Sequence, residues 1–169
     1  MHTLTAAEIL ILICVTIGAI TDLRTRMIYN WITFPAALGG FILNVCQAFA
    51  AGNMSASGQA ALWSAAGCAL GLLLVAGPQA LRRKQLIAPG DAKLWAAIGA
   101  CLFPIKMLIA WFYFSLAYAA VGYVLRALAK GDKSVGKTLI PLGPMIAVGT
   151  YLGIFLDKPL MHFMGFNWY

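Results

Sequence analysis

The chain has 169 residues, of which 62% are hydrophobic and only 10% are charged, and its mean hydropathy is +0.86. A soluble domain usually carries about 25% charged residues, and a globule of this size has too little interior to hide so much apolar surface. Composition therefore excludes a cytosolic enzyme, a secreted domain and a disordered tail, and predicts an all-α polytopic membrane protein. Twelve Lys and Arg against five Asp and Glu give a net charge of +7, which in a membrane protein indicates orientation before it indicates nucleic acid.

Apolar runs between polar breaks predict the membrane-spanning helices, because a bilayer core of about 30 Å needs roughly 20 helical residues. Four such runs are clear: Ala6–Thr21, Trp31–Ala51, Gln59–Leu81 and about Leu139–Leu156. The breaks after the first three are the polar segment Asp22–Asn30, the small-residue turn Gly52–Gly58 and the basic loop Arg82–Gly90. No Lys or Arg precedes the first run, so we expect it to stay in the protein and not to be a cleaved signal peptide. Without a linker or repeat, residues 1–169 are expected to form a single domain.

The stretch Ala92–Leu128 is too long for one crossing, since its 37 residues would make a helix of about 55 Å. A break at Phe103–Lys106 divides it and gives six spans, with both termini on the outer side. Ten basic residues then lie on the cytoplasmic side and two outside, against eight and four without the break; the positive-inside rule favours the first arrangement. The ten are Arg24, Arg26, Arg82, Arg83, Lys84, Lys93, Arg126, Lys130, Lys133 and Lys137, and the two are Lys106 and Lys158.

The first part of this stretch, Ala92–Phe103, makes only about 18 Å of helix. We expect either that the bilayer is thinner there or that a non-helical segment at Pro89-Gly90 leads into the helix below the surface. Small residues on the third and fourth spans are expected to allow close helix packing. They are Gly67, Gly71, Gly77 and Gly99.

Two of the five acidic residues are candidates for function. Glu8 and Asp157 read as solvated helix ends, and Asp132 reads as charge balance in a basic loop. Asp22 and Asp91, in contrast, both fall on the cytoplasmic side at the ends of apolar spans, where a carboxylate costs about 2.5–3.5 kcal/mol on insertion scales. The alternative is that Asp22 balances a nearby arginine and that Asp91 favours the start of its helix.

A pair of carboxyl groups can perform one specific reaction. When they lie close together they share a proton; the ionised group then takes a proton from water while the protonated group polarises a scissile carbonyl, which is aspartic proteolysis. This chemistry needs no metal and no cofactor. The sequence has no phosphate-binding Gly-rich loop, and its four cysteines show no metal-ligand or disulfide spacing.

Three segments resemble the motifs of the type IV prepilin peptidase family. Asp22–Trp31 resembles an Asp followed by a basic stretch and Ile-Pro-Asn, and Ile87–Leu94 resembles the Gly-x-Gly-Asp-x-Lys element shared with presenilin-like intramembrane aspartyl proteases. Ile140–Pro144 resembles the Pro-x-Gly-Pro element that opens the family's last helix. The resemblance implies Asp22 and Asp91 as the catalytic pair, with Ile28, Asn30, Gly90 and Lys93 as supporting or substrate-binding residues.

The chain departs from the family pattern at two positions and in one loop. Tyr29 replaces the usual Pro, and Ala88 stands where the first Gly is common. The large cysteine-bearing loop that the resemblance links to N-methylation is missing, so methyltransferase activity is not expected. This short form resembles the peptidase of tight-adherence (Flp-type) pilus systems.

The sequence therefore predicts an aspartic endopeptidase of the bacterial inner membrane with its active site facing the cytoplasm. The resemblance implies cleavage after a Gly that precedes the substrate's hydrophobic helix, with prepilins or pseudopilins as substrates and pilus-assembly proteins as further partners. No metal, cofactor or nucleic acid is expected. Two alternatives remain open: a small ion- or proton-coupled transporter, and a non-catalytic scaffold for pilus assembly.

Overall fold

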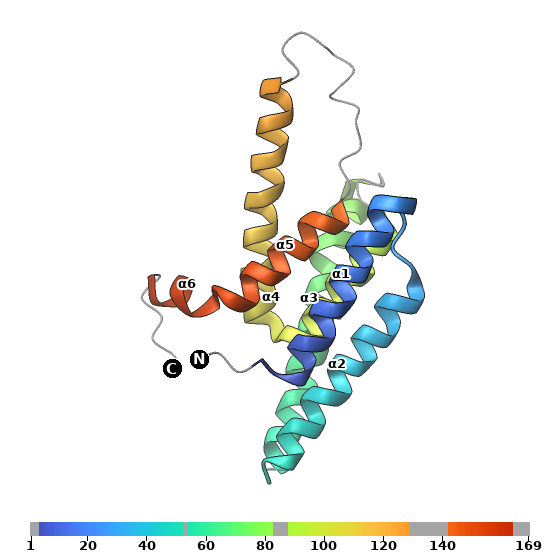
Figure 1. Cartoon of the computed structure of the whole chain (residues 1–169). Helices are drawn as coiled ribbons and strands as arrows, with labels where there is room; N and C mark the ends of the chain where they lie inside the picture. Colours follow the sequence, from blue (N-terminus) through green and yellow to red (C-terminus); the bar gives the residue numbers. More distant parts are fainter. Residues whose placement is uncertain (1–3, 53, 83–87, 129–141, 164–169) are drawn as a thin grey trace.

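The computed structural model describes residues 4–52, 54–82, 88–128 and 142–163, and these ranges contain helices and no strand. Figure 1 shows the helices in an oblique bundle. They are α1 (Ala6–Thr25), α2 (Asn30–Ala50), α3 (Met54–Arg82), α4 (Pro89–Leu128), α5 (Leu142–Phe155) and α6 (Asp157–Phe163). The predicted basic loops and the start of the predicted last span, with Asp132, Ile140 and Pro141, lie outside the described residues.

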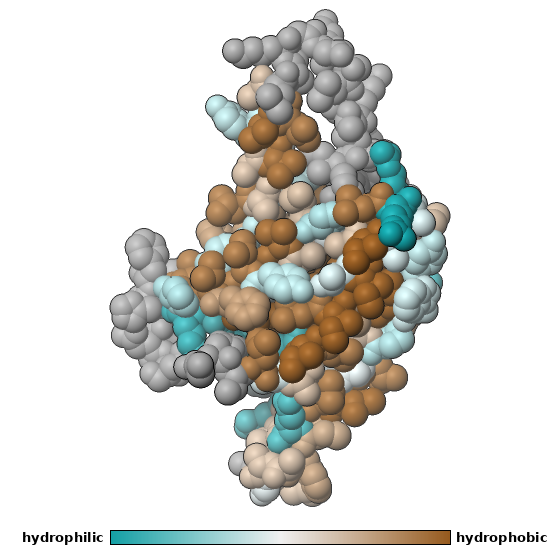
Figure 2. All heavy atoms as spheres, viewed as in Figure 1, coloured by the Kyte–Doolittle hydropathy of each residue, from teal (hydrophilic) through white to brown (hydrophobic). Residues whose placement is uncertain are grey.

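Among the described residues, four helices, α1 to α4, are long and apolar enough to cross a membrane, and α5 is a shorter apolar helix. Large apolar side chains such as Ile13, Trp31 and Leu62 are more than half exposed, and apolar residues cover much of the flank seen in Figure 2. Such a surface is costly in water and favourable against lipid. The protein is accordingly a multi-pass, all-helical membrane protein.

Helix α4 is divided at Phe103, where the backbone has φ 61° and ψ 168°. Pro104 follows and has no N–H, so the carbonyl of Ala100 cannot receive its usual helical hydrogen bond. The side-chain amide of Asn44 on α2 takes that place, donating to the carbonyls of Ala100 at 3.0 Å and Cys101 at 3.2 Å. The predicted break is thus confirmed, and a neighbouring helix satisfies the freed carbonyls, as a membrane interior requires.

The two halves of α4 fold back on each other at this break (Figure 1). Trp95 in the first half lies edge-on to Trp111 and Phe114 in the second half, with ring centroids 4.7 and 5.3 Å apart. The first half therefore runs away from the end of the bundle where α1 ends, and the second half returns toward it. This reversal places the first turn of α4 beside the last turn of α1.

Glycines bring α3 and the first half of α4 into backbone contact. A Cβ on Gly67 would collide with the backbone of Gly99, and one on Gly71 would collide with the carbonyl of Trp95. The predicted close packing is confirmed for Gly67, Gly71 and Gly99 and wrong for Gly77, which faces open space. Close backbone approach supplies the contact area that drives helix association in lipid.

Several predicted boundaries are wrong by a helical turn. α1 continues past Asp22 to Thr25 and ends where Arg26 takes the left-handed conformation and donates its N–H to the Asp22 carbonyl. α3 begins at Met54, inside the predicted turn. Pro89 and Gly90 form the first turn of α4 and not a non-helical entry, because Pro is well suited to a first helical position, where its missing N–H has no partner anyway.

Glu8 and Asp157, predicted to be solvated helix ends, are buried, with exposures of 2% and 1%. The ammonium group of Lys106 lies 2.7 Å from one carboxylate oxygen of Glu8 and 3.4 Å from Oδ2 of Asp157. Glu8 also completes a capping box with Thr5 at the start of α1. The prediction failed because hydropathy along the chain does not reveal that a lysine 98 residues away is folded onto Glu8.

Candidate functional site

Asp22 and Asp91 lie at the same level of the bundle. Asp22 is in the last turn of α1 and Asp91 is in the first turn of α4. One turn further into the bundle, α1 and α4 touch where Gly18 faces the side chain of Leu94, with 3.7 Å between a Cβ built on Gly18 and the nearest Leu94 carbon. The two segments are antiparallel (Figure 1). The turn that follows Gly18 in α1 and the turn that precedes Leu94 in α4 therefore lie at the same end of the bundle. The fold thus brings the two carboxyl groups together.

Both carboxyl groups are buried, Asp22 with 7% and Asp91 with 5% of its surface exposed. They are near enough for the charge of Asp22 to act on Asp91. Within the described part of the chain neither carboxylate has a Lys or Arg nitrogen within 4 Å, and Arg24 and Arg26 are exposed. The alternative in which Asp22 balances a nearby arginine therefore does not hold for these residues.

The N-terminus of α5 points at Asp22. The backbone N–H of Gly143 donates to Oδ2 of Asp22 at 2.7 Å, in a buried hydrogen bond between residues 121 positions apart. A Cβ at position 143 would stand 2.7 Å from Cβ of Asp22 and 2.9 Å from its Oδ2. Only glycine leaves room for this contact, and the first turn of a helix favours an anionic acceptor.

Gly143 was not predicted as a site residue. The sequence signal was present, because Leu142-Gly143-Pro144 belongs to the third motif. Its contact with Asp22 could not be found from the sequence, since it depends on how α5 packs against the end of α1.

Gly90 and Ile28, two of the predicted supporting residues, lie against each other. A Cβ on Gly90 would be 3.0 Å from the carbonyl oxygen of Ile28 and 3.1 Å from its Cβ. The backbone N–H of Asp91 donates to the carbonyl of Ala88 at 3.1 Å. The segment between α1 and α2 therefore covers the start of α4, and a small residue beside Asp91 permits that approach.

Lys93 and Asn30, the other two supporting residues, bind each other. The Lys93 ammonium donates to Oδ1 of Asn30 at 2.8 Å and stands 5.6 Å from the ring centroid of Phe34. The hydrogen bond between Lys93 and Asn30 joins the start of α4 to the start of α2. Asn30 opens α2 without capping it through its side chain.

The site has the composition for acid–base chemistry by carboxyl groups. In residues 4–52, 54–82, 88–128 and 142–163, no group of three or more His, Cys, Asp or Glu side chains is placed to hold a metal ion. What the arrangement offers is two buried carboxyl groups from different helices, each held by a backbone N–H. Such a pair can position and polarise a water molecule and protonate a leaving group.

Comparison with known proteins gives one match. A family model described as the type IV leader peptidase family matches residues 9–125, which is more than half of the chain and includes both aspartates. No curated protein and no solved structure matches significantly.

Proposed function

We propose, from the premise that the chain belongs to the type IV leader peptidase family, that it is an aspartic endopeptidase acting through Asp22 and Asp91. The family makes the chain a leader-peptidase-type protease of the membrane. The observation that carries the aspartic mechanism is the convergence of two buried carboxyl groups, without a basic partner among the described residues, from the end of α1 and the start of α4. Uncompensated carboxylates inside a membrane protein are costly and typical of functional sites.

Backbone N–H groups hold both carboxyl groups in place. The N–H of Gly143, at the N-terminus of α5, donates to Asp22, and such a donor holds a carboxyl group in a fixed position. The carboxyl group of Asp91, in the first turn of α4, accepts a backbone hydrogen bond from Ala88 and lies near enough to Asp22 for the two groups to interact. Asp22 and Asp91 are therefore assigned jointly: the ionised member of the pair takes a proton from water, and the protonated member donates its proton to the scissile carbonyl oxygen.

The orientation of the site is proposed from charge. The exposed Arg24 and Arg26 lie at the end of α1 that carries Asp22, and basic residues mark the cytoplasmic side of a bilayer. The broken α4 would then cross the membrane twice, which gives six spans with both termini outside. The pair would face the cytoplasm, where basic leader peptides of newly made substrates are located.

The proposed substrates are prepilins or pseudopilins, cut between a short basic leader and the hydrophobic helix that follows it. The described helices are joined by short connections, α1 to α2 through residues 26–29 and α2 to α3 through residues 51–53. This compact form supports a peptidase of the Flp type without methyltransferase activity. The setting would be the bacterial inner membrane.

The test is to replace each aspartate by asparagine and to follow conversion of a co-expressed prepilin to its mature size. General acid–base groups contribute about 10²–10⁴-fold to a rate, so Asp22→Asn and Asp91→Asn should each lower cleavage at least about 100-fold at unchanged membrane levels. Thr25→Ala is the control and should cleave at the parental rate, because Thr25 is an exposed side chain in the same last turn of α1 as Asp22.

Cleavage at the parental rate by either asparagine variant, present at normal membrane levels, would exclude the paired-aspartate mechanism. It would favour a scaffold, which tolerates loss of both charges if packing is kept. Ion-dependent flux into vesicles that requires Asp22 and Asp91, without any cleavage, would favour the transporter.

A further inference from the structure

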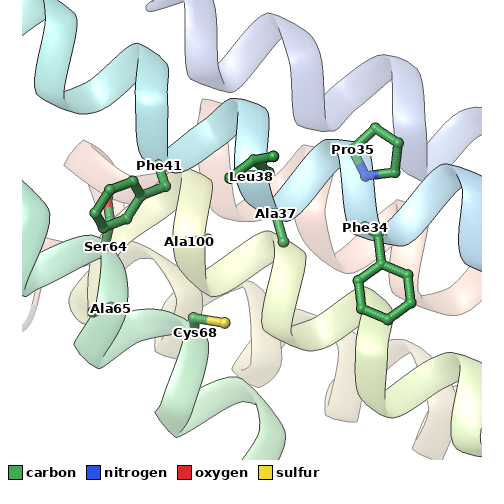
Figure 3. A pocket seen from close by; sticks show the side chains of 9 residues that line it. All are labelled: Phe34, Pro35, Ala37, Leu38, Phe41, Ser64, Ala65, Cys68 and Ala100. Atoms are coloured by element: carbon green, nitrogen blue, oxygen red, sulfur yellow. The ribbon is translucent and has the colours of Figure 1, made fainter.

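An apolar groove of about 680 Å³ lies between α2 and α3. Figure 3 shows its walls and floor: Phe34, Leu38 and Phe41 come from α2, Ala65 comes from α3, and Ala100 of α4 lies at the bottom. The hydroxyl of Ser64, which also lines the groove, is already engaged by the side-chain amide of Asn44 at 3.0 Å. The groove therefore offers almost only apolar contacts.

The groove exists because α4 holds α2 and α3 apart. α2 and α3 are joined by a tight turn in which Gly52 has a φ of 77°, and the first half of α4 is inserted between them further along. A Cβ on Gly40 of α2 would collide with Cys101 of α4, as one on Gly67 of α3 would collide with Gly99. α4 thus fills the deep side of the gap, and the outer side stays open.

One end of the groove lies at the level of the start of α4, the segment that carries Asp91. Phe34 lines that end, and its ring lies beneath the ammonium group of Lys93, two residues after Asp91. Ala100 in the floor follows Asp91 by nine residues, which is about 13 Å along a helix. The groove therefore has one end at the level of the start of α4, which carries Asp91, and extends from that level into the apolar part of the bundle.

We propose that this groove binds the apolar transmembrane helix of the substrate, in the segment that directly follows the cleaved bond. The inference rests on the proposed function, which places that bond at Asp22 and Asp91. A substrate whose cleaved bond lies at the aspartates must direct its following helix along the protein from that point, and one end of the groove lies at the same level of the bundle. Its apolar lining is complementary to the apolar side chains of a transmembrane helix.

The shape of the groove favours a helix over a lipid chain as its occupant. Small residues in the wall and floor, Ala65 and Ala100, permit the close backbone approach that membrane helices use for packing. Large side chains form the rim on α2, where Phe34 and Leu38 are 61% and 64% exposed and can close over two turns of an entering helix. The open outer side lets that helix arrive sideways through the bilayer.

The first test fills the groove from α3. Ala65 and Ala66 are neighbours, and both are exposed, but only Ala65 lines the groove. Ala65→Trp should lower kcat/KM at least about tenfold for a full-length prepilin in proteoliposomes. It should leave unchanged the cleavage of a soluble peptide that carries the leader and the cleavage site but ends before the apolar helix. Ala66→Trp should match the parental protein on both substrates.

Three results of this test would overturn the inference: parental kcat/KM of Ala65→Trp on the full-length prepilin, an equal loss on both substrates, or an equal loss in Ala66→Trp. Failure of the parental protein to cleave either substrate would instead overturn the proposed function, and the inference with it. The two failures are therefore distinguishable.

The second test reads contact directly and requires no loss of activity. A photo-crosslinking amino acid is placed at Leu38, which lines the groove, or at Ile42, which is exposed on the same helix outside it. Irradiation with prepilin in the membrane should give several-fold more cross-linked prepilin from position 38 than from position 42. Equal yields, or cross-links at position 38 to lipid alone, would contradict binding of the substrate helix in the groove.

Discussion

Two pairs of buried carboxyl groups lie at opposite ends of α1, and they differ in whether a cation neutralises them. Glu8 and Asp157 share Lys106, whose ammonium lies 2.7 and 3.4 Å from their oxygens. Asp22 and Asp91 have no cationic partner within the described residues, and Asp22 relies on one backbone N–H. The two pairs are therefore alike in burial and differ in whether a fixed cation compensates their charge.

The break in α4 produces this difference. Lys106 comes three residues after Phe103, so the reversal of the chain turns it toward the start of α1 and into contact with Glu8. The same reversal sends the first turn of α4, with Asp91, to the other end of α1. A single irregular residue thus separates a neutralised acidic pair from an uncompensated one.

The largest expected effect comes from removing the cation of the compensated pair. Lys106→Met leaves Glu8 and Asp157 buried without Lys106, and breaking a buried ion pair costs about 3 kcal/mol or more. We expect a clear loss of thermal stability in detergent, measured by the temperature at which the purified protein precipitates. Lys106→Arg keeps the charge and should lose less.

The contrast with the other pair makes this prediction specific. Asp91→Asn removes a charge that has no cation beside it among the described residues, so it should leave the thermal stability unchanged or raise it. If Lys106→Met and Asp91→Asn changed the stability equally, the carboxyl pairs at the two ends of α1 would not differ in their compensation by a cation.

The next effect comes from crowding Asp22. Gly143→Ala places a methyl group 2.7 Å from Cβ of Asp22 and must displace the carboxylate or the start of α5. Because a misplacement of about 1 Å can cost on the order of 100-fold in rate, we expect a loss of about ten- to a hundredfold in prepilin cleavage. Gly122→Ala on α4, where a Cβ meets nothing within 4 Å, is the control and should cleave at the parental rate.

The sequence was sufficient for those features that depend on local composition. Apolar runs predicted the helices α1 to α4, and Pro104 marked the break in α4. The motifs contained Gly90 and Gly143, and Gly90 was predicted to be a site residue. Each of these depends on properties of a few adjacent residues: hydropathy, a missing N–H or a missing Cβ.

The features that the sequence did not predict all depend on distant partners. The contacts of Asn44 with α4, of Lys106 with Glu8 and of Gly143 with Asp22 join residues 56 to 121 positions apart. Their geometry is set by where helices cross, which hydropathy does not encode. The apolar groove is of the same kind, since it results from the insertion of α4 between α2 and α3.

A smaller loss of stability is expected on removing Asn44, whose side-chain amide donates to the free carbonyls at the break in α4. Asn44→Ala leaves the carbonyls of Ala100 and Cys101 without their side-chain donor, and an unsatisfied buried polar group costs about 1–3 kcal/mol. We expect a stability loss of about 2 kcal/mol, measured by thermal denaturation in detergent. Gln47→Ala, an exposed position one turn along α2, should change the stability by much less.

The smallest expected effect concerns Lys93, a cation near the start of α4. Lys93 lies two residues after Asp91, yet its 2.8 Å hydrogen bond goes to Asn30, so we expect it to tie α4 to α2 and to contribute little to the chemistry. In a double-mutant cycle, Lys93→Met and Asn30→Ala should each destabilise the protein slightly and show a coupling energy of about 0.5–1 kcal/mol. Both single variants should keep cleavage within about threefold of the parental rate, because neither side chain neutralises an aspartate. A hundredfold loss of cleavage in Lys93→Met with unchanged stability would mean that this lysine acts on the carboxyl pair during the reaction, and the difference between the two ends of α1 would then hold only for the resting protein.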